Sequence, residues 1–389
     1  MLLLLSASCW AWSHLSHGEV ARYSRHLILG EVGVAGQEKL KNSRVLCVGA
    51  GGLGSPAMLY LAAAGVGTIT VVDDDVVEVS NLQRQIIHSS GSVGVPKTQS
   101  ASETLERVNP GCVVEQVRER LTLENAAELV AAHDVVVDGS DNFDTKFLVD
   151  DACVACGKPN VYAAILRFAG QVSVFNYPPG VGATYRDVLA AKPPPGAVPS
   201  CAEGGVLGVL CGVLGSIQAT EVVKLLIGRP IGETLANRLL CYDALAMRFN
   251  EIPLVRGARP RVVVVNETEA AAAAAVLEED AFAFETIGAR DVASRLADGW
   301  TPYVLDVRMP QEAAICGLPF ADGLCEHRSV ATLASKLPRD RDVLVHCKTG
   351  FRSRLACKAL AKLGFTRLYN MEGGILAWAR DVDPRLPVY

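Results

Sequence analysis

The sequence predicts an α/β protein with two domains, the first built on a mostly parallel sheet and the second smaller. Three observations support this prediction. The chain has 389 residues, which is the length of two or three domains. Short β-branched runs alternate with helical stretches in both halves, as in βαβ units. An acidic segment at residues 261–282 with six consecutive alanines separates the two patterns, and we expect it to be a linker.

In the first domain, apolar β-branched runs bounded by polar or glycine residues predict strands at Arg44–Gly49, Thr68–Asp73, Cys112–Val117, Asp134–Asp138, Asn160–Ala164 and Gln171–Phe175. The stretches between and after them predict helices near Ser55–Ala64, Thr98–Val108, Glu124–Ala132, Asp144–Cys156 and Gly204–Ile227. Tyr177–Ser200 holds six prolines, which predicts a long irregular loop of the kind that often carries function.

In the second domain, the same reasoning predicts strands at Tyr303–Val307 and Val343–Cys347 and a helix at Ser353–Leu363. The expected boundaries follow from these patterns. Residues 1–17 form a leader that we expect to be disordered, residues 18–260 the first domain and residues 283–389 the second.

Composition excludes several function classes. A net charge of −5 argues against a general nucleic-acid binder. The most apolar stretch, Val206–Gly228, is interrupted by Gln218, Glu221 and Lys224, so we expect a buried helix and no membrane association. Residues 1–17 lack the basic start of an export signal. Twelve irregularly spaced cysteines then favour a reducing cytoplasm over a disulfide scaffold.

Gly49-Ala50-Gly51-Gly52-Leu53-Gly54 matches the G-x-G-x-x-G pattern of nucleotide-binding turns. It follows a predicted strand, opens a predicted helix and precedes Asp73 at the end of the next strand. Glycines there allow close approach of phosphate, and the helix N-terminus favours negative charge. The motif predicts a Rossmann-like nucleotide site. The structural alternative is a glycine turn needed only for packing. The enzyme class in which this motif is most common is the NAD-dependent oxidoreductases.

The residues after Asp73 favour a triphosphate with Mg²⁺ instead. Arg84 and Lys97 could neutralise phosphate oxygens, and Asp141 at the end of a later strand could hold the metal. Each has an ordinary alternative, since Arg84 and Lys97 could be surface charges and Asp141 a helix cap. Their occurrence together in this order shifts the interpretation away from hydride transfer.

Residues 19 to about 252 resemble the MoeB/ThiF adenylating enzymes, relatives of ubiquitin-activating enzyme. The matching segments are V-G-A-G-G-L-G, V-V-D, S-N-L-Q-R-Q, G-V-P-K and S-D-N-F-D-T-K, with R-Y-S-R-H-L before them and P-S-C-A-E-G-G-V-L-G after them. The resemblance implies that ATP is bound by the glycine motif (Gly49, Gly51, Gly52, Gly54) and by Asp73, Ser80, Asn81, Leu82, Gln83, Arg84, Lys97, Asp141 and Asn142.

The same resemblance implies the reaction and the partners. Arg84 would be catalytic, Asp141 would hold Mg²⁺, and Arg25 would reach the site from the other subunit of a homodimer. The substrate would be the C-terminal Gly-Gly of a ubiquitin-like sulfur carrier protein of the MoaD, ThiS or CysO type. Its carboxylate would be joined to the α-phosphate of ATP, with loss of pyrophosphate.

Two cysteines are candidate catalytic groups. Cys201 lies in P-S-C-A-E-G-G before a predicted helix, where the helix dipole would favour its thiolate. It could attack an acyl-adenylate or a persulfide, although a small buried residue is the alternative. Cys347 begins H-C-K-T-G-F-R-S between a strand and a helix, so backbone N–H groups could converge on its sulfur, with Lys348 and Arg352 adding charge.

The Cys347 segment, with L-D-V-R at Leu305–Arg308 and N-M-E-G-G-I-L-A-W at Asn370–Trp378, resembles the rhodanese-fold sulfurtransferases. Four residues separate Cys347 from Arg352, as in sulfurtransferases, whereas phosphatases with a Cys…Arg loop have five. The resemblance implies a catalytic persulfide on Cys347, loaded from thiosulfate or a cysteine desulfurase, and a thiocarboxylate on the carrier as product. The segment Pro310–His327 departs from the usual pattern.

Most MoeB/ThiF relatives hold structural zinc on two C-x-x-C pairs. This chain reads Thr184-Tyr185-Arg186-Asp187 and Arg261–Val265 where those pairs are expected. Its one C-x-x-C, Cys153–Cys156, falls in a predicted helix and cannot supply four ligands. We therefore expect no zinc. The loss of both pairs, together with the fused second domain, resembles the MoeZ type of actinobacteria. An NAD-dependent oxidoreductase and a non-catalytic docking scaffold with a rhodanese module stay open as alternative functions.

Overall fold

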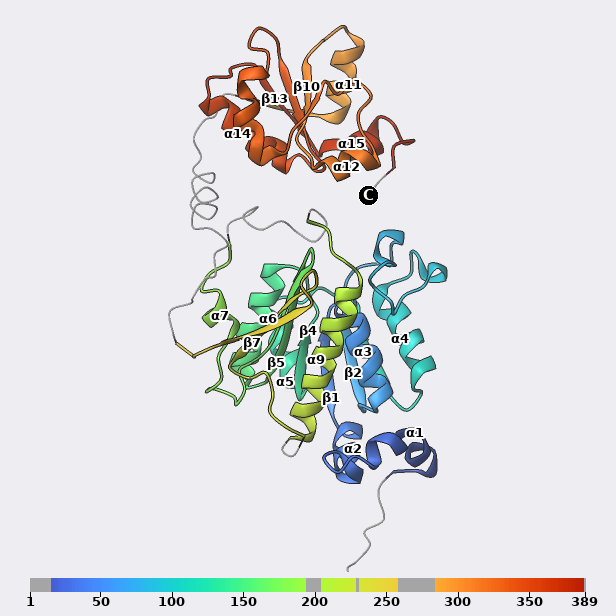
Figure 1. Cartoon of the computed structure of the whole chain (residues 1–389). Coiled ribbons are helices and arrows are strands. Elements are labelled where there is room, and N and C mark those ends of the chain that lie inside the picture. The colour runs from blue at the N-terminus through green and yellow to red at the C-terminus, as the bar shows by residue number, and fades with distance from the viewer. Residues whose placement is uncertain (1–14, 194–203, 229–230, 258–283, 388–389) are drawn as a thin grey trace, which may run out of the picture. The chain divides into compact units, whose positions relative to one another are not determined.

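The structure is a computed structural model that describes residues 15–193, 204–228, 231–257 and 284–387. The chain divides into two compact units, which are treated separately below (Figure 1). Residues 1–14 of the expected leader (residues 1–17), the expected linker at residues 261–282 and Cys201 lie outside the described residues. The last three leader residues are ordered, because Leu15 is buried, Ser16 caps α1 and His17 begins that helix.

The first unit is built on an eight-stranded sheet in the order β3-β2-β1-β4-β5-β6-β7-β8. The first five strands in this order are parallel, and β5 to β8 pair antiparallel. The strands are β1 (Arg44–Val48), β2 (Thr68–Val72), β3 (Val113–Val117), β4 (Val135–Asp138), β5 (Asn160–Leu166), β6 (Ala169–Phe175), β7 (Arg238–Asp243) and β8 (Arg248–Pro253). Because β1 lies between β2 and β4, the chain changes direction across the sheet beside β1, where nucleotide sites form in such folds.

Helices cover both faces of this sheet (Figure 1). One core joins the β1 and β5 side chains to α3, α4 and α9, and a second joins the opposite face to α5 and α6. The helices of this unit are α1 (His17–Leu27), α2 (Gly33–Lys41), α3 (Gly54–Ala64), α4 (Lys97–Val108), α5 (Ala126–Ala131), α6 (Phe143–Cys156), α7 (Tyr185–Val188) and α9 (Val209–Ile227). The prediction of an α/β fold with a largely parallel sheet is confirmed.

Helix α9 is long and apolar enough to cross a membrane by length and composition alone. It packs instead against α3 and the sheet, and most polar atoms of Gln218 and Glu221 find partners inside the unit, although Gln218 Oε1 is buried without one. Gln218 donates to the Asp138 and Val161 carbonyls at 2.9 and 2.8 Å. Glu221 accepts from Lys224 and from the Leu235 N–H. It is therefore a core helix, as the interrupting polar residues predicted.

The second unit has a five-stranded, wholly parallel sheet in the order β11-β10-β12-β13-β9. Its strands are β9 (Glu285–Gly288), β10 (Tyr303–Asp306), β11 (Gly323–Leu324), β12 (Val343–His346) and β13 (Leu368–Glu372). Its helices are α11 (Ala289–Ala297), α12 (Pro310–Ile315), α13 (Val330–Leu333), α14 (Phe351–Lys362) and α15 (Gly374–Asp381). Separate apolar clusters fill the two faces, one with α13 and α14 and the other with α11 and α15.

The structure also contains elements that the sequence did not predict, among them α1 and α2 in the first unit and β9, β11, β13, α11, α12, α13 and α15 in the second. The β7–β8 hairpin was not predicted, because β8 is mostly exposed and has few apolar residues. The expected irregular loop contains the short helix α7, and α9 begins only at Val209.

Candidate functional sites

The glycine turn connects β1 to α3 at the carboxyl end of the parallel strands. Gly49 has φ +95°, and a β-carbon there would lie 3.1 Å from the Gly139 carbonyl oxygen at the end of β4. A β-carbon on Gly54 would lie only 2.0 Å from the Gly49 carbonyl oxygen. A β-carbon on Gly52 would lie 2.6 Å from Cys211 Sγ. The glycines are thus required by the turn itself, which leaves backbone N–H groups at the start of α3 for an anion.

Asp73 follows β2 and reaches across to this turn. Its carboxylate accepts from the Ala50 N–H at 2.8 Å and from the Asp75 N–H at 2.9 Å. Burial raises the pKa of Asp73, while nearby Lys97 and the two backbone bonds oppose the increase. Lys97 begins α4 and is buried; its Nζ lies 2.7 Å from Asp75 and 4.0 Å from Asp73. Asp73 and Lys97, both assigned to ATP binding by the resemblance, are therefore neighbours.

The segment Ser80–Arg84 lies on the other side of the glycine turn, with Val79–Asn81 in a 3₁₀ turn. Arg84 donates from Nη1 to the Ser80 carbonyl at 2.9 Å, and its Cγ would lie 3.5 Å from a β-carbon on Gly52. Gln83 is close to α9, because its carbonyl oxygen would lie 2.4 Å from a β-carbon on Gly208. Arg84 is thus the member of the sequence-predicted set Ser80, Asn81, Leu82, Gln83 and Arg84 that contacts the glycine turn, while Gln83 packs beside the residue that precedes α9.

Asp141 and Asn142 follow β4 at the same edge of the sheet and are exposed. Asn142, not Asp141, caps α6 by accepting from the Thr145 N–H at 2.9 Å, so the alternative role for Asp141 as a cap is wrong. Three further carboxylates at this edge, those of Asp73, Asp74 and Asp75, lie within 4.8 Å of one another. Carboxylate oxygens suit Mg²⁺, so the residues present fit a hard cation.

Arg25 is not brought to this site within the chain. It is exposed on α1, whose Tyr23 hydroxyl accepts from Asn109 Nδ2 at 2.8 Å. A β-carbon on Gly65, at the end of α3, would meet the Tyr23 ring at 2.6 Å. Helix α1 therefore lies against the opposite end of α3 from the glycine turn (Figure 1). Any contact of Arg25 with the site must come from a second chain.

The sequence did not predict two residues, His88 and Ser55, that hydrogen-bond the backbone of the glycine turn. His88 is buried, with Nε2 2.9 Å from the Ala50 carbonyl and Nδ1 2.9 Å from Ser100 Oγ. Ser55 Oγ donates to the Gly51 carbonyl at 2.6 Å. Only the position of Ser55 directly after the motif offered a signal, because the His88 contacts arise from the packing of α4 beside the turn.

Residues 184–187, which stand where relatives carry the first zinc-binding pair, are fixed by hydrogen bonds and an ion pair. Arg186 makes a two-point ion pair with Asp151, with both bonds at 2.7 Å. Asp187 accepts from the Thr184 N–H and from the Gly257 N–H, each at 2.8 Å. The second expected position, Arg261–Val265, lies outside the described residues. Cys153 of the C-x-x-C pair is fully buried among apolar side chains on α6.

A buried carboxyl adjoins this segment and predicts a dependence of stability on pH. Asp150 lines a pocket of about 430 Å³ and accepts from the Tyr185 N–H, while its Oδ2 is buried without a partner. Burial raises its pKa from 3.8 to about 7. Because folding raises this pKa, the stabilisation it gives is present below pH 4 and is lost as the pH rises to about 7.

We expect Asp150→Asn to be more stable than the parent at pH 8, by on the order of 1–3 kcal/mol, and this advantage to be smaller at pH 5, where only part of the loss has occurred. Melting temperatures of both proteins at the two pH values test this. Glu128→Gln, an exposed change on α5, should follow the parent at both. An Asp150→Asn difference that does not depend on pH would contradict the assignment.

In the second unit, Cys347 follows β12 and starts the loop that leads to α14. Its Sγ accepts from the Gly350 N–H at 3.1 Å and lies 3.5 Å from Ser353 Oγ. Gly350 has φ +92°, and a β-carbon there would lie 2.8 Å from the Gly373 nitrogen. The Cys347 side chain is buried, with 0 % exposure. The loop therefore surrounds the sulfur and directs donors at it, as a thiolate or persulfide anion requires.

The loop is held from behind by α15. The Ile375 N–H donates to the Cys347 carbonyl at 2.9 Å, and the Leu376 N–H donates to the Lys348 carbonyl at 3.2 Å. A β-carbon on Gly374 would lie 2.4 Å from the Cys347 carbonyl oxygen, so glycine is needed for this approach. The second half of N-M-E-G-G-I-L-A-W thus fixes the backbone of the Cys347 loop.

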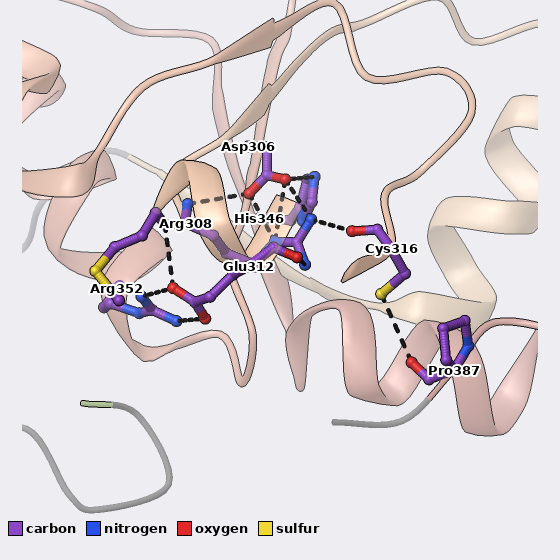
Figure 2. A network of polar contacts seen from close by, with 8 residues as sticks. Asp306, Arg308, Glu312, Cys316, His346, Arg352 and Pro387 are labelled. Carbon is purple, nitrogen blue, oxygen red and sulfur yellow. Dashed lines mark hydrogen bonds and ion pairs between the residues drawn. The ribbon is translucent and has the colours of Figure 1, made fainter. Parts of the chain in front are cut away.

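Arg352, the predicted partner of Cys347, is bound to a carboxylate. Its Nη1 and Nη2 lie 2.6 and 2.7 Å from the two carboxylate oxygens of Glu312 on α12 (Figure 2). Arg308 forms a second buried pair with Asp306, with Nη2 2.6 Å from Oδ2. His346 lies 3.9 Å from Asp306, and burial lowers its pKa to about 4, so it is neutral. The sequence pattern did not predict the role of Glu312.

Comparison with known proteins identifies the family of each of the two units. The ThiF family matches residues 23–263, and the rhodanese-like domain matches residues 288–381. A Mycobacterium tuberculosis H37Rv protein named "Probable adenylyltransferase/sulfurtransferase MoeZ" is 46% identical over 385 residues, covering 97% of each chain. The Anopheles gambiae "Adenylyltransferase and sulfurtransferase MOCS3" is 39% identical, covering 96% of this chain and 90% of that one.

Solved structures share the fold of the first unit. Escherichia coli MccB has a TM-score of 0.55 at 22% identity, covering 64% of this chain and 75% of that one. PaaA has a TM-score of 0.54 at 23% identity, covering 65% of this chain and 79% of that one. The predicted resemblance is confirmed: the chain belongs to the ThiF family, carries a rhodanese-like domain behind the ThiF domain, and is an adenylyltransferase and sulfurtransferase.

Proposed function

We propose that the first unit uses ATP to adenylate the C-terminal Gly-Gly of a ubiquitin-like sulfur carrier of the MoaD, ThiS or CysO type. The observation that carries this proposal is the joining of the glycine turn, Asp73, Lys97 and Arg84 at one edge of the sheet. An extended Gly-Gly tail has no side chains and can enter a site bounded by closely packed loops. The carrier carboxylate attacks the α-phosphorus, and pyrophosphate leaves.

Each residue then has a defined part in this step. Asp73 holds the ribose, while backbone N–H groups of the turn, with Ser80–Gln83 and Asn142, hold the nucleotide. Arg84 and Lys97 neutralise the charge that develops on the phosphates. Mg²⁺, when bound at Asp141, adds further neutralisation there. Arg25 would complete the site from a second chain, because α1 lies at the far end of α3.

In the second unit, we propose that Cys347 carries the sulfur as a persulfide, loaded from thiosulfate or from a cysteine desulfurase. The terminal sulfur attacks the acyl carbon of the adenylated carrier, and AMP leaves. A second thiolate, proposed to be Cys201, then attacks the Cys347 sulfur, which breaks the S–S bond and releases the carrier thiocarboxylate. Because Cys347 is fully buried, neighbouring side chains must move before a donor reaches its sulfur.

We test the adenylation step by ATP–pyrophosphate exchange with a carrier that ends in Gly-Gly. Arg84→Ala should lower the exchange rate about 10²–10³-fold, since the guanidinium acts on charge that develops in the reaction. Arg107→Ala, an exposed change on α4, is the matched control and should exchange at the parent rate. Parent protein that releases no pyrophosphate with any such carrier would refute the proposed substrate.

Domain boundaries and quaternary structure belong to the same proposal. We propose residues 18–260 as the adenylating domain and residues 283–389 as the rhodanese domain of a cytoplasmic homodimer. Mixing an Arg25→Ala chain with an Arg84→Ala chain tests whether Arg25 of one subunit completes the ATP site of the other. The readout is ATP–pyrophosphate exchange. Recovery of part of the exchange activity in the mixture is expected, because one of the two sites in a mixed dimer is then intact.

A further inference from the structure

The Cys347 loop ends on an arginine whose charge is already cancelled. Arg352 and Glu312 form a two-point pair, and each side chain is only 10% exposed. An ion pair buried in this way keeps its attraction, because little water screens it. The guanidinium that closes the loop therefore presents almost no net positive charge to an incoming anion.

Glu312 is held in place by its surroundings (Figure 2). Its Oε2 also accepts from the Met309 N–H at 3.1 Å. The fully buried Arg308 donates to the Glu312 carbonyl at 3.3 Å and to the Cys316 carbonyl at 2.8 Å, which fixes both ends of α12. The position of the Glu312 carboxylate is thus a built feature of the unit and not a chance surface contact.

The charges around the loop cancel in pairs. Asp306 cancels Arg308, and Glu312 cancels Arg352. The sulfur itself receives neutral donors, the Gly350 N–H and the Ser353 hydroxyl. Lys348 is a further cation of the loop, and its side chain is also largely buried. Such a site suits a sulfur anion with a single charge better than an assembly of several charges.

Donors differ in the charge they bring. With a persulfide donor R–S–SH, the Cys347 thiolate attacks the outer sulfur, the donor S–S bond breaks, and a thiolate R–S⁻ leaves while Cys347 keeps S–SH. This exchange carries one negative charge throughout. With thiosulfate, the same attack breaks the S–S bond, sulfite leaves with two charges, and the Cys347 persulfide keeps one. That exchange carries three negative charges past the loop.

We propose that Glu312 determines the class of sulfur donor: by neutralising Arg352, it selects persulfides of thiol compounds or proteins over free dianions such as thiosulfate. The inference deepens the proposed function of Cys347 and rests on it. Removing the carboxylate charge would release the guanidinium for the dianion, whereas the persulfide reaction needs no such cation.

The test compares two donors, glutathione persulfide and thiosulfate, by the sulfane sulfur loaded on the full-length protein. In Glu312→Gln, the ratio of kcat/KM for thiosulfate to kcat/KM for glutathione persulfide should rise about tenfold or more, since a repulsive charge is removed beside the loop. Glu312→Asp keeps the charge and should restore the parent ratio. Glu372→Gln removes an exposed charge next to the same loop and should leave the ratio unchanged.

The outcomes separate this inference from the proposed function. An unchanged ratio in Glu312→Gln, or an equal increase in Glu372→Gln, would overturn the role of Glu312 while Cys347 still loads sulfur. Parent protein that loads no sulfur from either donor would overturn the function of Cys347. A measurement on the parent needs no variant: sulfate at constant ionic strength should not inhibit loading from glutathione persulfide, and strong inhibition would show that a dianion does bind at the loop.

Discussion

Cys347→Ala is expected to stop sulfur transfer to the carrier, with a loss of at least about 10³-fold, because a methyl group cannot bind a second sulfur. ATP–pyrophosphate exchange should continue at the parent rate, since the adenylating residues lie in the other unit. Formation of the carrier thiocarboxylate, followed by mass spectrometry of the intact carrier, measures the first activity. Isotope exchange into ATP measures the second.

Cys325→Ala is the matched control for this experiment. Cys325 lies in the same unit, is partly exposed and packs beside the same apolar cluster as Cys347. Its variant should form thiocarboxylate at the parent rate. If Cys347→Ala also did so, the persulfide on Cys347 would be excluded as the sulfur source.

Gly54→Ala is expected to lose adenylation activity and to keep sulfur loading on Cys347, the reverse of Cys347→Ala. Its β-carbon would lie 2.0 Å from the Gly49 carbonyl oxygen, and because the clashing atoms are backbone, no flexible side chain can move aside. The turn must open, so we expect ATP–pyrophosphate exchange to fall about 10²-fold or more and the first unit to lose roughly 2–4 kcal/mol of stability. Loading of sulfur on Cys347 should not change.

Gly212→Ala is the control for a glycine substitution near this site. Gly212 lies within α9, and a β-carbon there would meet nothing within 4 Å. Alanine favours a helix over glycine by about 1 kcal/mol, so this variant should be equal to the parent or more stable. Parent-like exchange in Gly54→Ala would contradict the geometry of the turn.

Local patterns made much of this architecture predictable. The glycine turn, Asp73 and the Cys347 loop each depend on residues that are close in sequence, where the alternation of strand, turn and helix fixes the geometry. The short pairing of Lys97 with Asp75, and its position 4.0 Å from Asp73, were not predicted. The alternative of Asp141 as a helix cap was wrong, because the neighbouring Asn142 caps α6.

Contacts between distant segments could not be predicted in this way. Glu312 and Arg352 are 40 residues apart, and their pairing depends on where Arg308 fixes α12. The burial of Cys347 and the position of His88 likewise arise from packing. The position of Arg25 at the far end of α3 required the path of α1, for which the sequence has no local signal beyond R-Y-S-R-H-L.

Helix α15 has a consequence for how this chain matures. The N–H groups that hold the carbonyls of Cys347 and Lys348 come from Ile375 and Leu376, near the end of the sequence. A nascent chain therefore exposes this thiol before the residues that shape its surroundings have emerged and docked. Until the final helix emerges and docks, oxidants and adventitious electrophiles meet an unguarded cysteine, so newly made protein should be most vulnerable to inactivation during synthesis.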